Sequence, residues 1–362
     1  THAIELDRRR WLLGSGATLA SALGVGTLAN LTLNVKPARA ADYKALVCIF
    51  LYGGNDGMNM IVPNDARYDQ YSGVRKGLSI PKASLTPLAG VSYGLHPAMA
   101  ALAPAWTAGH LAPVFNVGPL VQPLTKAQYR AATANSATLP DSLFSHSDQQ
   151  ILWETGSSSA LTRTGWGGRA AETLATVNPV ISVAGTARFG LSSLQTPLVL
   201  PGPGATFGAQ GLQASDTWAP QVARKAAIDA LYAQSQEVAL GDAYTAAQRD
   251  AFAMSTRLGA LVKTKPGDAD AIAAIDTAFA PITGADKKIT TPLGNQLYQL
   301  AKLIAGNATV QGNRQLFFAS MGGFDTHGNQ LVTGSPLEGD HARLLKQLGD
   351  ALAAFYAALK AI

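Results

Sequence analysis

The sequence is poor in cysteine and in charge. Cys48 is the only cysteine among 362 residues, so no disulfide can form within the chain. Because Cys48 stands in an apolar run, we expect its thiol to be buried and unreactive. Charged residues make up 14% of the chain, and after the first forty residues no apolar run is long enough to cross a bilayer. A disulfide scaffold and a membrane-spanning mature protein are therefore excluded.

Two common sequence signatures are also missing. The chain has no Gly-x-Ser-x-Gly motif, which argues against an ordinary serine esterase. It has no Cys-x-x-Cys pair either, which argues against a structural zinc ribbon.

What the N-terminus does have is the pattern of an export signal. Asp7–Leu13 contains consecutive arginines followed by large apolar residues, the twin-arginine pattern. Gly14–Leu33 is uncharged and mildly apolar, and Ala38 and Ala40 supply the small residues that a signal peptidase needs. We expect residues 1–40 to be a signal peptide carried by the twin-arginine translocase, and the mature protein to be periplasmic or secreted. The alternative is an uncleaved N-terminal anchor.

Removing this signal changes the apparent charge. The whole chain has 28 basic and 23 acidic residues, and residues 1–40 hold five and two of them. The remainder has 23 basic and 21 acidic residues, a net charge of +2. A nearly neutral mature chain gives no reason to expect nucleic acid or an anionic membrane surface as a partner.

Apolar strand-like runs alternate with helical patterns along the rest of the chain. This alternation favours a mainly parallel α/β sheet, and we expect one large domain over residues 41–362. Segments rich in Gly, Pro and Thr at 185–215 and 264–290 are expected to be loops. Strands are predicted at 45–51, 111–116, 179–183 and 315–319, and helices at 97–107, 146–153, 216–263, 293–304 and from 337 onward.

A first polar cluster, Tyr52–Asn59, follows the first strand-like run. Its glycines let the backbone approach a ligand closely, and Asp56 supplies hard carboxylate oxygens of the kind that suit a divalent metal. Asn-Asp-Gly is also ordinary turn chemistry, so a tight turn is the alternative.

A second polar cluster, Met321–Gln330, follows the run at 315–319. Asp325 and His327 stand two residues apart on a glycine-flanked loop and can both point at one metal. A carboxylate and a neutral imidazole suit zinc, manganese or iron. The carboxyl ends of parallel strands are where ligands collect, and this favours the metal interpretation. A hydrogen bond within the loop is the alternative.

A third polar cluster, Asp141–Gln149, has the composition of a helix start. Ser145 and Ser147 would lie beside free backbone N–H groups at the positive end of the helix, a suitable place for a nucleophile that meets an anion. Simple helix capping is the alternative. Elsewhere, His96 is expected to act as a local cap, Arg169 to form a surface salt bridge, and His341 to lie at the start of the last helix.

Several of these motifs occur together in one known family. The twin-arginine leader, Leu46–Met60, Asn116–Leu124, Phe144–Gln150, Gly165–Arg169 and Gly322–Gln330 appear in this order. This combination resembles the bacterial family called domain of unknown function 1501, and the resemblance covers essentially the whole chain.

That family resembles a distant branch of the alkaline phosphatase and sulfatase superfamily. The resemblance implies a three-layer α/β/α sandwich with a mainly parallel sheet, and an exported metal-dependent hydrolase of phosphate or sulfate esters. It implies zinc, manganese or calcium held by Asp56, Asp325 and His327, with Ser145 or Ser147 as the nucleophile toward an anionic ester.

Members of the family continue beyond the last helical pattern into a segment with further metal-ligating residues. The final helical run has no cap before Ile362, so we expect the C-terminal part of the domain to be missing. Two other functions remain open. One is a non-enzymatic exported binding or envelope-assembly protein that retains the fold, and the other is a metal-independent serine hydrolase that uses His146.

Overall fold

The computed structural model describes residues 43–362, apart from 134–135, 175, 177, 214, 235–237, 311–312 and 333. The predicted signal peptide, residues 1–40, lies outside these described residues. The described chain groups into two compact units. Unit 1 contains residues 43–47, 163–264 and 303–318, and unit 2 contains residues 48–162, 265–302 and 319–362. The prediction of a single domain over 41–362 stays a prediction.

The main sheet has four strands in the order β1-β7-β5-β6. β5 pairs in parallel with both β6 and β7. At β1 the amide of Lys44 donates to Asn313 and the amide of Tyr52 donates to Met321, so β1 also runs parallel to β7. The α/β class with a mainly parallel sheet is therefore confirmed. The strands are β1 (Lys44–Leu51), β5 (Val180–Ser182), β6 (Leu198–Val199) and β7 (Arg314–Met321).

A small antiparallel sheet in unit 2 was not predicted. Its strands, in the order β2-β4-β3, are β2 (Ile61–Pro63), β4 (Tyr93–Leu95) and β3 (Thr86–Pro87). They are only two or three residues long, too short for a pattern of alternating hydrophobicity to show. Val62 is fully buried and packs with Ile80 and Leu85 in a small apolar core of its own.

Most predicted helices are present with shifted ends. The segment 97–107 forms a 3-10 helix, η5 (Pro97–Leu102), followed by α4. The long helical region is divided into α8, which ends at Ala233, and α9, which begins at Ala239, close to the break predicted near Gly241. The strand predicted at 111–116 is wrong, because that segment has no regular structure. The α-helices are α3 (Arg67–Arg75), α4 (Ala103–Thr107), α5 (Lys126–Ala131), α6 (His146–Thr155), α7 (Trp166–Ala171), α8 (Ala219–Ala233), α9 (Ala239–Lys263), α10 (Ala273–Phe279), α11 (Pro292–Ala305), α12 (Asn307–Val310) and α13 (Asp340–Ala361).

Short 3-10 helices connect many of these elements. Besides η5, they are η2 (Gly57–Asn59), η3 (Lys76–Leu78), η4 (Lys82–Ser84), η6 (Arg188–Gly190), η7 (Ala280–Ile282) and η8 (His327–Asn329). No helix in the described part of the chain is long and apolar enough to cross a membrane.

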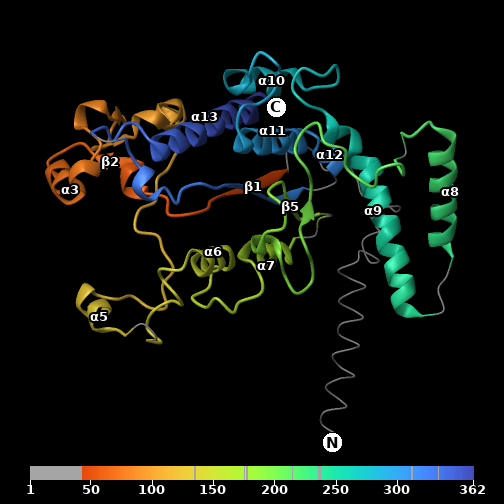
Figure 1. Cartoon of the computed structure of the whole chain (residues 1–362), viewed down its shortest axis with the longest axis horizontal. Helices are drawn as coiled ribbons and strands as arrows, with labels where there is room; N and C mark the ends of the chain where they lie inside the picture. The colour runs from red at the N-terminus through yellow and green to blue at the C-terminus, as the bar shows by residue number, and fades with distance from the viewer. Residues whose placement is uncertain are drawn as a thin grey trace, which may run out of the picture. The chain divides into compact units, whose positions relative to one another are not determined.

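The core of unit 2 is organised around α13, which packs against η5 and η7 and against α10 (Figure 1). Leu345 and Ala351 of α13 are fully buried, as is Phe279 of α10. Gly349 allows a close approach of η5, since a Cβ on it would lie 3.1 Å from Cα of Met99. Burying this apolar face supplies the main stabilisation of α13.

Unit 1 contains the pair α8 and α9, which lie side by side (Figure 1). Phe189 stacks on Phe318 of β7 with ring centroids 5.1 Å apart and meets Trp166 edge to face at 4.6 Å. Gly167 makes room for this ring, because a Cβ there would be 2.4 Å from it.

Candidate functional site

The loops that follow β1 and β7 are tied together by backbone hydrogen bonds. After β1, the carbonyl of Tyr52 accepts from the amide of Phe324 at 3.2 Å. Phe324 is fully buried and anchors the β7 loop from within. The two polar clusters predicted from the sequence at 52–59 and 321–330 therefore begin next to each other, at the carboxyl ends of neighbouring parallel strands.

Gly53 is the residue that permits this close contact. Its φ of +104° lies in the region that favours glycine, and a Cβ built on it would lie 2.5 Å from the backbone nitrogen of Asp325. Its neighbour Gly54 lies beside the helix that carries the third cluster, since a Cβ on Gly54 would be 3.9 Å from Cε1 of His146. All three polar clusters thus meet at this glycine pair.

The carboxylate of Asp325 lies between two imidazoles. Its Oδ1 is 2.7 Å from Nε2 of His327, and its Oδ2 is 3.4 Å from Nε2 of His146. The three side chains are well exposed, at 47% for Asp325, 55% for His146 and 76% for His327. The predicted pair of Asp325 and His327 is thus brought together, and His146 joins it from the third cluster.

Ser145 and Ser147 lie at the start of α6, next to His146 in sequence. Ser145 is the N-cap residue, and its Oγ accepts from the amide of Asp148 at 3.3 Å. The two serine hydroxyls are 3.1 Å apart. The capping alternative is therefore realised for Ser145, and a role of either serine as nucleophile stays a prediction.

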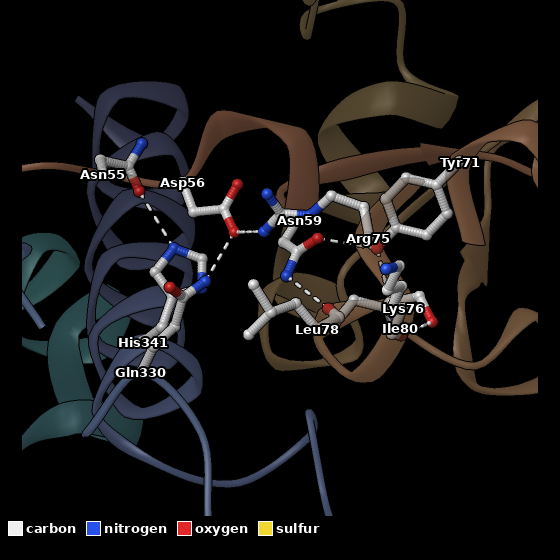
Figure 2. A network of polar contacts seen from close by, with 11 residues as sticks. Asn55, Asp56, Asn59, Tyr71, Arg75, Lys76, Leu78, Ile80, Gln330 and His341 are labelled. Atoms are coloured by element: carbon white, nitrogen blue, oxygen red, sulfur yellow. Dashed lines mark hydrogen bonds and ion pairs between the residues drawn. The ribbon is translucent and has the colours of Figure 1, made fainter. Parts of the chain in front are cut away.

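Asp56 belongs to a different network (Figure 2). Its Oδ2 accepts from Nη2 of Arg75, in an ion pair whose side chains are 13% and 17% exposed, and from Nε2 of Gln330 at 2.6 Å. Among the described residues, no hydrogen bond or ion pair joins Asp56 to Asp325 or His327. The structure therefore does not bring the three predicted metal ligands into one contact group.

The backbone around Asp56 forms the turn that was the alternative to a metal site. The amide of Gly57 donates to Asn55, and the amide of Asn59 donates to the carbonyl of Asp56, so that η2 begins there. Asn59 is buried, accepts from the hydroxyl of Tyr71 at 2.7 Å and donates to the carbonyl of Leu78 at 2.9 Å (Figure 2). The turn is thus held from two sides by side-chain hydrogen bonds.

Two buried histidines, His341 and His96, lie next to this turn. Nε2 of His341, at the start of α13, is 3.2 Å from Oδ1 of Asn55, and its ring meets that of His96 edge to face at 6.4 Å. His96 caps η5, as predicted, because its Nδ1 accepts from the amide of Ala98. Burial, together with the neighbouring His341, lowers the pKa of His96 from 6.5 to about 4, although the Pro336 carbonyl acts in the opposite direction. Burial also lowers the pKa of His341.

A pocket of about 630 Å³ opens beside His146 and the two glycines. One wall is the end of β1, and the other is the segment that leads into α6 and its first two turns. The lining residues are Ile49, Phe50, Leu51, Gly53, Gly54, Asn55, Leu143, Phe144, Ser145, His146, Gln149, Gln150 and Trp153.

The donor types around Asp325 fit a transition metal, because one carboxylate and two imidazoles are common ligands of zinc, manganese and iron. Their exposure lets a cation reach them. In the arrangement described, however, the imidazole nitrogens face the carboxylate, and within the described ranges no group of three or more His, Cys, Asp or Glu side chains is arranged to hold a metal ion. Asp325, His146 and His327 therefore fit a metal ion in residue type and proximity, while in this arrangement the two imidazoles contact the carboxylate.

Sequence reasoning missed part of this arrangement. It placed Asp325 and His327 together but grouped Asp56 with them as a metal ligand, whereas the folded chain pairs Asp56 with Arg75 and Gln330. His146 was assigned only to the serine hydrolase alternative, although its place between two candidate serines was a usable signal.

Comparison with known proteins identifies one family. Residues 43–362 match the family described as "Protein of unknown function (DUF1501)". The comparison with curated proteins gives no match, and the comparison with solved structures gives none either.

Proposed function

The chain belongs to the DUF1501 family, and from this membership and the geometry of the site we propose that it is an exported, metal-dependent hydrolase of phosphate or sulfate esters. One observation carries the proposal. Asp325 lies between His146 and His327 at the carboxyl end of β7, directly against the glycine loop that follows β1. Ligands collect at this edge of a parallel sheet.

In this proposal Asp325 and His327 hold the metal, and His146 is the third donor. A divalent metal supplies Lewis acidity toward an ester oxygen and neutralises the charge of the transferring group. Zinc or manganese suits this donor set better than calcium, which prefers oxygen ligands. Asp56 is offered as a ligand by the family resemblance alone, since its Oδ2 is occupied by Arg75 and Gln330.

The N-terminus of α6 supplies the remaining groups. Either Ser145 or Ser147 acts as the nucleophile, and the free amides and positive end of this ten-residue helix favour an anionic ester nearby. The proposal includes a three-layer, alkaline-phosphatase-like sandwich. It also includes export through the twin-arginine translocase after folding, the usual route for proteins that acquire a metal in the cytoplasm.

Metal content tests the proposal directly. We expect protein purified from its native periplasm to contain stoichiometric zinc or manganese by mass spectrometry, and to release phosphate or sulfate from an ester. The double variant Asp325→Ala/His327→Ala should lose the metal, whereas His110→Ala, an exposed histidine bonded to Tyr356, should keep it. Native protein without stoichiometric metal would refute the proposal.

One observation favours a second function. The Oδ2 of Asp56 is engaged in an ion pair with Arg75, so this predicted ligand serves the fold in the arrangement described. A non-enzymatic exported protein that binds an anion or takes part in envelope assembly would need no converging ligands. Metal-free native protein that binds phosphate or sulfate without hydrolysing esters would support this function.

A third function, a metal-independent serine hydrolase, makes a different prediction. His146 contacts Asp325, as the base of such a site would contact its orienting carboxylate. No hydrogen bond between His146 and either candidate serine occurs among the described residues. This function predicts that a fluorophosphonate labels the protein and that chelators do not reduce the labelling. Loss of the labelling in Ser145→Ala or Ser147→Ala would favour this function.

A further inference from the structure

The pocket beside His146 has walls of a different character from the polar cluster at its rim. Ile49, Phe50 and Leu51 form one wall, and Leu143, Phe144 and Trp153 contribute to the other.

None of the residues that line this pocket is an Asp, Glu, Lys or Arg. Its polar members are histidine, serine and amide side chains, and His146 and Ser145 are two of them. Away from Ser145 and His146 at the start of α6, a lining without fixed charge does not select an anion. It favours an uncharged, largely apolar group of a ligand. His146 lines the pocket and also contacts Asp325, so a polar end of the same ligand would lie near Asp325.

Two aromatic side chains that line this pocket are exposed to solvent. Phe144 is 91% exposed and Trp153 is 42% exposed. Exposing large apolar rings together is unfavourable in water, and such patches on soluble proteins commonly mark binding sites. Rings recognise other flat rings well, because stacked and edge-to-face contacts add to the burial of apolar area.

The size of the pocket agrees with a small organic ligand. Its volume of about 630 Å³ lies within the range of about 300–1,000 Å³ that is typical of small-molecule sites. This is far more space than a lone phosphate or sulfate fills. The lining that remains beyond His146 and Ser145 is largely apolar and includes Phe144 and Trp153.

From this geometry we propose that the pocket binds the organic part of the ligand, and that this part is a flat apolar ring. Phe144 and Trp153 contact the ring, and they determine specificity rather than take part in the chemistry. The identity of the anionic end rests on the proposed function, whereas binding of the ring does not require hydrolysis.

Calorimetry with non-hydrolysable probes tests the inference on the full chain as purified. We expect phenylphosphonate to bind about tenfold more tightly than methylphosphonate, because only the former buries a ring. In Phe144→Ser this preference should fall about threefold or more, and Trp153→Leu should lower it similarly. Because Phe144 is almost fully exposed, its replacement should leave folding intact.

Matched controls come from exposed apolar residues outside the pocket. Leu161→Ser, at an 82% exposed position, and Trp218→Leu, at a 62% exposed one, should keep the full preference for phenylphosphonate. Equal binding of the two phosphonates would overturn the inference, as would failure of both to bind, or a preference that Phe144→Ser leaves unchanged.

The same experiment separates this inference from the proposed hydrolase. If phenylphosphonate binds through Phe144 but no ester is hydrolysed, the pocket assignment stands and the hydrolase falls. If esters are hydrolysed with no preference for a ring, the hydrolase stands and the pocket assignment falls.

Discussion

The missing side chain of Gly53 is what allows Asp325 to occupy its position. A Cβ on Gly53 would lie 2.5 Å from the backbone nitrogen of Asp325, 2.9 Å from the carbonyl carbon of Phe324 and 3.2 Å from Cβ of Asp325. These are backbone atoms or atoms attached directly to the backbone, and they cannot move aside as the end of a flexible side chain can. The loop after β1 and the loop after β7 therefore fit together only with glycine at this position.

We predict that Gly53→Ala destabilises the fold by about 2 kcal/mol or more, from the clash and from the unfavourable φ. Urea unfolding measures the loss. Gly57→Ala is the matched control, since a Cβ there meets nothing within 4 Å and the φ of Gly57 is not positive. Equal stability of the two variants would contradict the close packing of Gly53 against Asp325.

The ion pair of Arg75 with Asp56 should matter for stability. Replacing Arg75 by Met leaves a largely buried carboxylate without its cation, which should cost about 3 kcal/mol. Arg343→Met, which breaks an exposed pair with Asp340, should cost much less. If both variants unfold at the same urea concentration, the ion pair of Asp56 with Arg75 does not stabilise the fold, and this result would support Asp56 as a metal ligand.

The proposed third metal donor can be tested by itself. We predict that His146→Ala lowers zinc affinity about tenfold or more, because one of three ligands is lost. His110→Ala should bind zinc as the wild type does. A competition titration with a chromophoric chelator measures the affinity. An unchanged zinc affinity in His146→Ala would show that His146 is not a ligand, and that Asp325 and His327 bind the metal without it.

The buried His96 should make stability depend on pH. Its pKa is about 4 in the folded chain, against 6.5 ordinarily. Between these values the unfolded chain binds a proton that the folded chain does not, so the free energy of unfolding falls as the pH is lowered. We expect a loss of about 2 kcal/mol between pH 7.5 and pH 5 from this group.

Urea unfolding at the two pH values measures this loss. The difference should shrink in His96→Asn, which keeps an acceptor for the amide of Ala98 but does not titrate. The difference should persist in His110→Asn, which replaces an exposed histidine. An unchanged difference in His96→Asn would show that other groups are responsible.

The single thiol gives a further test of the structure. Cys48 is half buried, and burial, with a smaller effect of the nearby Glu154, raises its pKa from 9.0 to about 11. A shift of this size lowers the thiolate fraction about a hundredfold, so iodoacetamide should modify the folded chain far more slowly than the urea-unfolded chain. Equal rates at pH 8 would contradict the position assigned to Cys48.

Some features were predictable because they depend on local pattern. The continuous apolar runs at 45–51 and 315–319 identify the strands β1 and β7. Coverage on both faces holds for β7, which is mostly buried, and is wrong for β1, whose residues 44–46 are exposed. Ser145 followed by a helical pattern identifies the start of α6. His96 before Pro97 identifies a helix cap in the same way. These signals lie within a few neighbouring residues.

Other features depend on residues far apart in the chain. The strands β2, β3 and β4 carry too few residues for periodicity to distinguish them from loops. The segment 111–116 is apolar enough for a strand, yet no neighbouring strand pairs with it. Pairing partners are decided by tertiary packing, which overrides local propensity.

By itself, the sequence determined the α/β class, the family, and the pairing of Asp325 with His327 two residues apart. Only the tertiary structure decided the partners of these residues. It brought His146 to Asp325 across the glycine pair, tied Asp56 to Arg75 and Gln330, and placed an uncharged aromatic pocket beside the cluster. The physical reason is that local pattern specifies an element, whereas side-chain convergence depends on how distant elements pack together.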